Sequence, residues 1–135
     1  MDASPLALPV DDCRRVLAAL LDQVPHIRGA VLCRSDGFEV TGATRGTVPM
    51  SRLSALSSSM VALGQASLRE IGLAGGGTVL IEGGDGKLLL LEVPSPVQPL
   101  VLAVVGSGEL VTGTLLWAAR DCVARLLPLI TPTTP

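Results

Sequence analysis

Three short apolar runs constrain the fold of this chain most. They are Ala30–Cys33, Leu88–Leu91 and Val101–Val105. A strand with solvent on one face alternates apolar and polar residues, whereas a strand covered on both faces is apolar throughout. The runs therefore predict three central strands of one sheet with helices on both faces.

Two further segments are predicted as edge strands of this sheet. Phe38–Thr41 alternates apolar and polar residues, and Thr78–Glu82 is short and has polar ends. The turn signals Ser35-Asp36-Gly37 and Gly83–Gly86 join each of them to a central strand as a hairpin. Because hairpins join neighbours, we expect one antiparallel sheet with the strand order 2-1-5-4-3.

Three segments with helical periodicity surround the strands. Pro9 suits the start of the first helix, and Pro25 ends it. The predicted helices are Val10–Val24, Met50–Ile71 and Glu109–Leu127.

The expected fold class is α/β in the α+β sense, with the topology αββαβββα. The 135 residues suit one domain. We expect it to span residues 10–127, between an N-terminal tail of residues 1–9 and a C-terminal tail of residues 128–135, with Thr131–Pro135 frayed.

The composition excludes several function classes. Apolar residues make up 48% of the chain, which is too many for a disordered protein. The net charge is −2, so a nucleic-acid partner bound through a basic surface is not expected. The apolar run Val16–Leu21 is too short for a membrane span, and the acidic N-terminus does not resemble a signal peptide. We expect a cytoplasmic protein without membrane insertion.

The three cysteines are interpreted as core residues. Cys13, Cys33 and Cys122 lie far apart in the sequence, and His26 is the single histidine. This spacing argues against a disulfide framework and a zinc site, and it favours a reducing compartment. We expect no metal, no cofactor and no catalytic residue. The enzymatic alternative is a thiol hydrolase that uses Cys33 and His26.

Two glycine-rich segments invite a phosphate-binding interpretation. Gly83–Lys87 lacks the flanking residues of a phosphate-binding loop, so it is interpreted as a hairpin turn. Gly106–Gly108 is interpreted as a strand-to-helix turn with Ser107 as a candidate helix cap, and anion binding is the weaker alternative.

The long helix Met50–Ile71 is predicted to have two buried faces. Leucines dominate the stripe expected to pack on the sheet, and no charge occurs between Leu53 and Leu68. A solvated helix face normally carries charges. The expected core stripe is Leu53, Leu56, Met60, Leu63, Gly64, Ser67 and Ile71.

The opposite face is small and neutral, which suits two helices that approach closely. We predict a homodimer through this face, which Ala62→Glu or Ala55→Arg should break. The edge strand Thr78–Glu82 can also pair with a symmetric partner. The alternatives are an exposed helix rich in Ser and Ala, or cover by a loop of the same chain. The predicted interface residues are Ser51, Ser54, Ala55, Ser58, Ala62, Gln65, Ala66, Arg69, Thr78 and Leu80.

The succession of segments resembles the Roadblock domain, the dynein light chain type that also occurs in bacterial regulators of small GTPases. The resemblance begins with Val24-Pro25-His26-Ile27-Arg28-Gly29-Ala30-Val31-Leu32 and Ser35-Asp36-Gly37, followed by the long helix. It closes with Leu102–Val105 and Gly113-Thr114-Leu115-Leu116, and it covers roughly residues 10–127.

The resemblance implies a homodimer, paired through the long helix and the neighbouring edge strand into one continuous sheet. It also implies a domain without catalysis, which acts as a scaffold or binds a Ras-like small GTPase and modulates its nucleotide cycle. A small-molecule-sensing or general scaffold dimer is the alternative.

Overall fold

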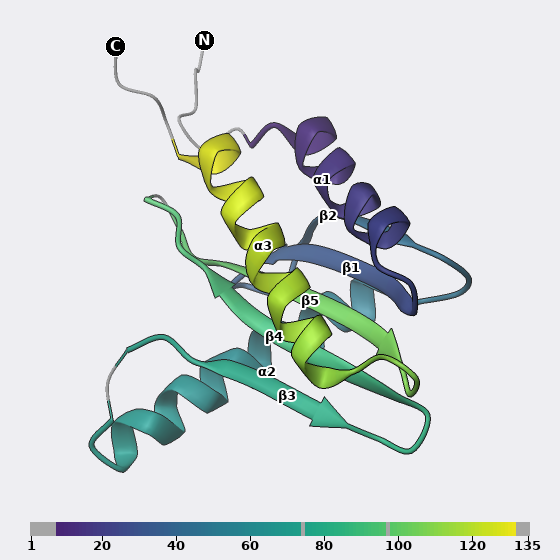
Figure 1. Ribbon diagram of the computed structural model, residues 1–135. Helices are drawn as coiled ribbons and strands as arrows, with labels where there is room; N and C mark the ends of the chain where they lie inside the picture. Colours follow the sequence, from purple (N-terminus) through teal and green to yellow (C-terminus); the bar gives the residue numbers. More distant parts are fainter. Residues whose placement is uncertain (1–7, 74, 97, 132–135) are drawn as a thin grey trace, which may run out of the picture.

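The computed structural model describes residues 8–73, 75–96 and 98–131, and in these residues the predicted topology is confirmed (Figure 1). Its five antiparallel strands lie in the order β2-β1-β5-β4-β3. The elements follow one another as α1 (Val10–Gln23), β1 (Ile27–Arg34), β2 (Glu39–Thr44), α2 (Met50–Glu70), β3 (Thr78–Glu82), β4 (Gly86–Val93), β5 (Leu100–Ser107) and α3 (Thr112–Ile130). The expected tails fall mostly outside the described residues.

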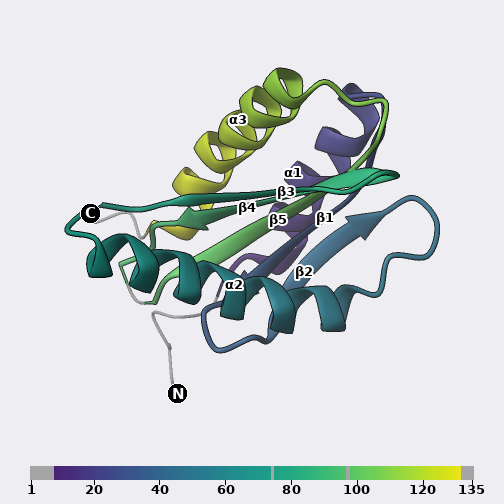
Figure 2. The same ribbon diagram turned by 90° about the horizontal axis from the view of Figure 1, so that it is seen from below.

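The sheet separates two layers of helices. Helices α1 and α3 cover one face, and α2 crosses the other face alone (Figure 2). Strand β5 is central because it pairs with β1 on one side and with β4 on the other. Its apolar residues alternate between the two faces and therefore contribute to both cores.

Two apolar clusters fill the two layers. The larger cluster lies under α1 and α3 and contains the buried Leu17, Leu102 and Leu115. The smaller cluster lies under α2 and contains the buried Val61 and Leu90. The face under α2 is thus held by fewer apolar contacts.

Several predicted boundaries differ from those in the structure. Strand β2 begins at Glu39 and extends to Thr44, whereas the sequence predicted Phe38–Thr41. Strand β5 extends to Ser107 because its pairing with β4 continues as far as Gly86, which lies opposite Ser107. The last helix therefore begins at Thr112 and not at Glu109, and it ends at Ile130.

Candidate dimer interface

Helix α2 lies on the sheet with a different face from the predicted one. Ser54, Ser57, Ser58 and Val61 are buried against the sheet. Of the expected core stripe, Leu53 and Met60 are partly buried and pack against the smaller cluster, but Leu56 and Leu63 point outward and are 60% and 67% exposed. The helix is turned by about a quarter of a turn from the prediction, at 3.6 residues per turn.

Two of the three buried serines, Ser54 and Ser58, find hydrogen-bond acceptors within the chain, whereas the Ser57 hydroxyl has no partner among the described residues. The Ser54 hydroxyl donates to the carbonyl oxygen of Met50 at 2.8 Å. The Ser58 hydroxyl lies 2.9 Å from the carbonyl oxygen of Ser54 and 2.8 Å from that of Arg34. Short side chains also let the helix axis approach the sheet closely.

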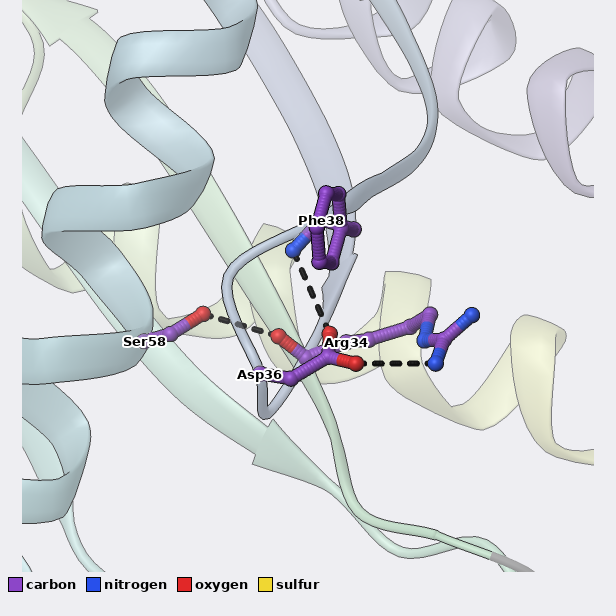
Figure 3. A network of polar contacts seen from close by, with 4 residues as sticks. All are labelled: Arg34, Asp36, Phe38 and Ser58. Carbon is purple, nitrogen blue, oxygen red and sulfur yellow. Dashed lines mark hydrogen bonds and ion pairs between the residues drawn. The ribbon is translucent and has the colours of Figure 1, made fainter.

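The contact of Ser58 fastens α2 to the turn between β1 and β2 (Figure 3). In that turn, Arg34 forms an ion pair with Asp36, and Asp36 accepts a hydrogen bond from the backbone N–H of Phe38. The Phe38 ring is largely exposed, and the neighbouring Gly37 lies close to Ala55 of α2.

The outward side of α2 forms what we call the exposed α2 face. It is apolar or small along the middle of the helix and carries no charge between Leu53 and Leu68. The charges Arg52, Arg69 and Glu70 stand only at its two ends. The exposed α2 face consists of Ala55, Leu56, Ser59, Ala62, Leu63 and Ala66.

Strand β3 provides an adjoining edge. It pairs with β4 on one side only, and Leu80 and Ile81 are exposed on it. The backbone groups on its free side can pair with another strand. Between α2 and β3 lies a small hollow of about 240 Å³, lined among others by Gly64, Leu68 and Val79. The exposed α2 face and the free edge of β3 therefore lie next to each other.

The structure places the ten predicted interface residues unequally. Ser54 and Ser58 are buried under α2, so they cannot meet a partner, and this part of the prediction was wrong. Gln65 is half-buried and donates a hydrogen bond to Glu92 on β4. The exposed ones are Ser51, Ala55, Ala62, Ala66, Arg69, Thr78 and Leu80. Leu56 and Leu63 on the exposed α2 face are not among the ten, because hydropathy alone placed them in the core.

The residues of the thiol-hydrolase alternative lie far apart. His26 and Cys33 stand near opposite ends of β1, about 20 Å apart at the rise of a strand. Cys13 lies roughly 15 Å along α1 from the end of the helix that His26 follows. Burial raises the pKa of the Cys33 thiol, although hydrogen bonds with Ser58 and Ser54 oppose the shift. This arrangement does not form a nucleophile and base pair.

All three cysteines are free thiols in the core, as the sequence predicted. Burial raises the pKa of Cys122 from 9.0 to about 12, and the neighbouring Asp121 adds to the shift. In the unfolded chain the thiol ionises near 9. Unfolding therefore releases a proton between these two values, and stability falls as the pH rises from about 9 towards 12.

We expect the melting temperature to fall steadily above about pH 9, and to fall less in the variant Cys122→Ala. The chain has no tyrosine and only one lysine, Lys87, but Cys13 and Cys33 also have raised pKa values, so they account for the fall that remains in Cys122→Ala. The measurement is thermal unfolding followed by circular dichroism across this pH range. If the melting temperature fell equally with pH in the unchanged protein and in Cys122→Ala, the Cys122 thiol would not be buried and neutral as described.

Trp117 lies on α3 next to α1, and its side chain is 67% exposed. Within residues 8–73, 75–96 and 98–131, no helix has the length and apolar content needed to cross a bilayer. In the same residues no group of three or more His, Cys, Asp or Glu side chains could hold a metal ion.

Comparison with solved structures finds the same fold in several bacterial proteins. The chain resembles a Roadblock/LC7 domain from Streptomyces avermitilis, at 23% identity over 84% of this chain and 93% of that one, with a TM-score of 0.76. It resembles MglB from Myxococcus xanthus, at 15% identity over 100% of this chain and 98% of that one, with a TM-score of 0.79. For the gliding protein MglB from Thermus thermophilus, the identity is 18%, the coverage 96% and 93%, and the TM-score 0.78.

At these identities the solved structures show the fold alone, and no curated protein matches the chain. The sequence itself matches the model of the Roadblock/LC7 domain over residues 15–105. This match spans most of α1, all five strands up to Val105 and the whole of α2. The chain therefore belongs to the Roadblock/LC7 domain family.

Proposed function

We propose that the chain is a non-catalytic, cytoplasmic homodimer that binds a Ras-like small GTPase and modulates its nucleotide cycle or scaffolds its complex. The observation that carries the dimer is the exposed α2 face. Leu56 and Leu63 project from a helix surface that has no charge along its middle. A monomer would leave this apolar surface in water, at a cost of roughly 25 cal/mol per Å² of apolar area.

A dimer with its two-fold axis beside β3 would bury the exposed α2 face and the free edge of β3 together. Two copies of Thr78–Glu82 would pair along their free edges and join the two sheets. The α2 helices would then lie on the same face of the joined sheet, with Ala62 and Ala66 allowing close approach beside the leucines. The same surface serves both protomers, as two-fold symmetry requires.

The GTPase partner is supported by family membership, since Roadblock domains include bacterial regulators of small GTPases. The absence of catalysis is supported by the separation of His26 from Cys33 and Cys13. A joined sheet with two α2 helices on one face also offers a broad platform for a partner protein.

The test is capture of the partner from native lysate with the tagged dimer, in GDP and in a non-hydrolysable GTP analogue. We expect mass spectrometry to identify a Ras-like GTPase that is enriched at least about tenfold in one nucleotide state, which corresponds to ~1.4 kcal/mol. The control is Val111→Glu, which places a charge away from α2 at a position as exposed as Leu63. This variant should recover the same GTPase as the unchanged protein. Failure to recover a GTPase in either state would refute the partner but not the dimer, which is measured separately by sedimentation.

A further inference from the structure

We propose that a cleft at one end of the sheet binds the phosphate group of a small ligand that also has an uncharged organic part. The cleft has a volume of about 580 Å³. This lies within the range of small-molecule sites, roughly 300–1,000 Å³. It is lined by the loop after β2, by the turn between β3 and β4, and by the ends of β1 and β5.

The cleft joins the two glycine-rich segments that the sequence singled out. Gly86 is paired with Ser107 across β4 and β5, and the backbone N–H of Gly108 donates to the carbonyl oxygen of Asp85 at 2.9 Å. A Cβ atom at Gly86 would lie 2.6 Å from the carbonyl oxygen of Gly106, so the two backbones are as close as glycine permits. Neither segment forms a phosphate loop alone, but together they form one wall.

The lining is positively charged in a chain whose net charge is −2. Arg28, Arg45 and Lys87 line the cleft, and Asp85 is the single carboxylate residue among the lining residues. Arg45 pairs with Asp22 at 3.0 Å, and the Lys87 ammonium donates to the carbonyl oxygen of Leu110. Among the described residues, Arg28 has no ion-pair partner within 4.0 Å. Its guanidinium is free to bind a phosphate through two parallel hydrogen bonds.

A buried hydroxyl in the same wall lacks a partner among the residues that the structure describes. Ser107 is 9% exposed, and its Oγ atom makes no hydrogen bond to them. A buried polar group without a partner is costly, so its retention needs an explanation. Ser107 does not cap α3, because that helix begins five residues later at Thr112. The Oγ atom has almost no accessible surface, so a phosphate oxygen in the cleft would supply the missing acceptor once the Ser107 side chain turned towards the cleft.

The remaining lining accounts for the organic part of the ligand. Val48, Leu88 and Val105 line the cleft with partly buried apolar side chains, and Ile81 on the edge strand adds a fourth. These four side chains offer no hydrogen bonds, so they suit an uncharged carbon skeleton. The phosphate can come from a free metabolite or from a lipid headgroup, and the experiment separates the two.

The test uses the protein labelled with ¹⁵N and two kinds of probe. Inorganic pyrophosphate and glycerol 3-phosphate represent free ligands, and phosphatidylcholine vesicles with and without phosphatidic acid represent lipid. We expect saturable shifts of the amide signals of Gly83, Gly84, Gly86 and Gly108, or sedimentation with the vesicles that depends on phosphatidic acid. Arg28→Gln should weaken binding at least about tenfold, whereas Arg120→Gln on α3 should leave it unchanged.

The variant Ser107→Ala separates ligand binding from a purely structural role. We expect it to weaken the same binding roughly tenfold without lowering the melting temperature, since it removes a hydroxyl without a partner. Amide shifts caused by the soluble probes would identify the ligand as a free metabolite. Binding to the acidic vesicles alone would identify it as a lipid headgroup. No saturable binding to any probe, or equal binding by Arg28→Gln and Arg120→Gln, would overturn the proposal.

Discussion

Replacing Leu63 by glutamate is expected to convert the proposed dimer into folded monomers. Leu63 is 67% exposed at the centre of the exposed α2 face. Burial of a carboxylate without a partner costs several kcal/mol, and two-fold symmetry brings two copies into one interface. We expect the dimer dissociation constant to rise at least about a thousandfold, which corresponds to ~4 kcal/mol.

The monomer should stay folded because both apolar clusters lie within one chain. The measurement is sedimentation velocity over a range of concentrations, with circular dichroism to verify folding. The matched control is Val111→Glu, where a valine 68% exposed lies before α3, on the other side of the sheet. A dimer of unchanged strength in Leu63→Glu would refute the interface, as would equal dissociation in both variants.

The sheet could be predicted from the sequence because burial on both faces leaves a local signature. The apolar runs in β1, β4 and β5 identified the three central strands, and two hairpin turns fixed the neighbours of each edge strand. Strand β3 was predicted with the bounds that the structure has, because Gly77 and Gly83 flank it. Each of these inferences needed only a few consecutive residues.

The orientation of α2 could not be predicted in the same way. Hydropathy favours Leu56 and Leu63 over Ser54 and Ser58 as core residues. In the structure of the single chain, however, the two serines are buried and the two leucines are exposed. Serine hydroxyls satisfied by backbone carbonyls can be buried, and leucines can face outward where a partner is expected. The predicted interface therefore included two residues of α2, Ser54 and Ser58, that the structure buries against the sheet. The leucines and serines of α2 lie on two different faces of the helix. This pattern indicated that either face could pack on the sheet.

The cleft could not be predicted from the sequence either, although both of its glycine-rich segments were identified there. Arg28, Arg45 and Lys87 belong to three different segments, so no spacing along the chain relates them. Ser107 was interpreted as a helix cap because β5 was ended two residues too early. Pairing between β4 and β5, which decides where β5 ends, depends on residues far apart in the chain, such as Gly86 and Ser107.

Truncation of Leu102 is expected to be the most damaging change to folding that leaves the exposed α2 face untouched. Leu102 is fully buried on β5, where it lies between Leu32 on β1 and Leu91 on β4. Its side chain belongs to the larger cluster under α1 and α3. Because neighbours surround it on both strands, the site cannot collapse easily around a smaller residue. A buried leucine replaced by alanine costs about 2–5 kcal/mol, most where the cavity persists.

We therefore expect Leu102→Ala to lower the free energy of unfolding by about 4 kcal/mol, within a total of roughly 5–15 kcal/mol for a domain. The measurement is urea unfolding of the monomeric Leu63→Glu background, so that dissociation does not contribute to the transition. Leu102→Met keeps the volume and should cost less than about 1.5 kcal/mol. If both substitutions cost the same small amount, β5 would not be the strand on which the two layers depend. A large loss confined to Leu102→Ala would mean that the platform for any partner is stabilised from the α1–α3 side, on the face opposite α2.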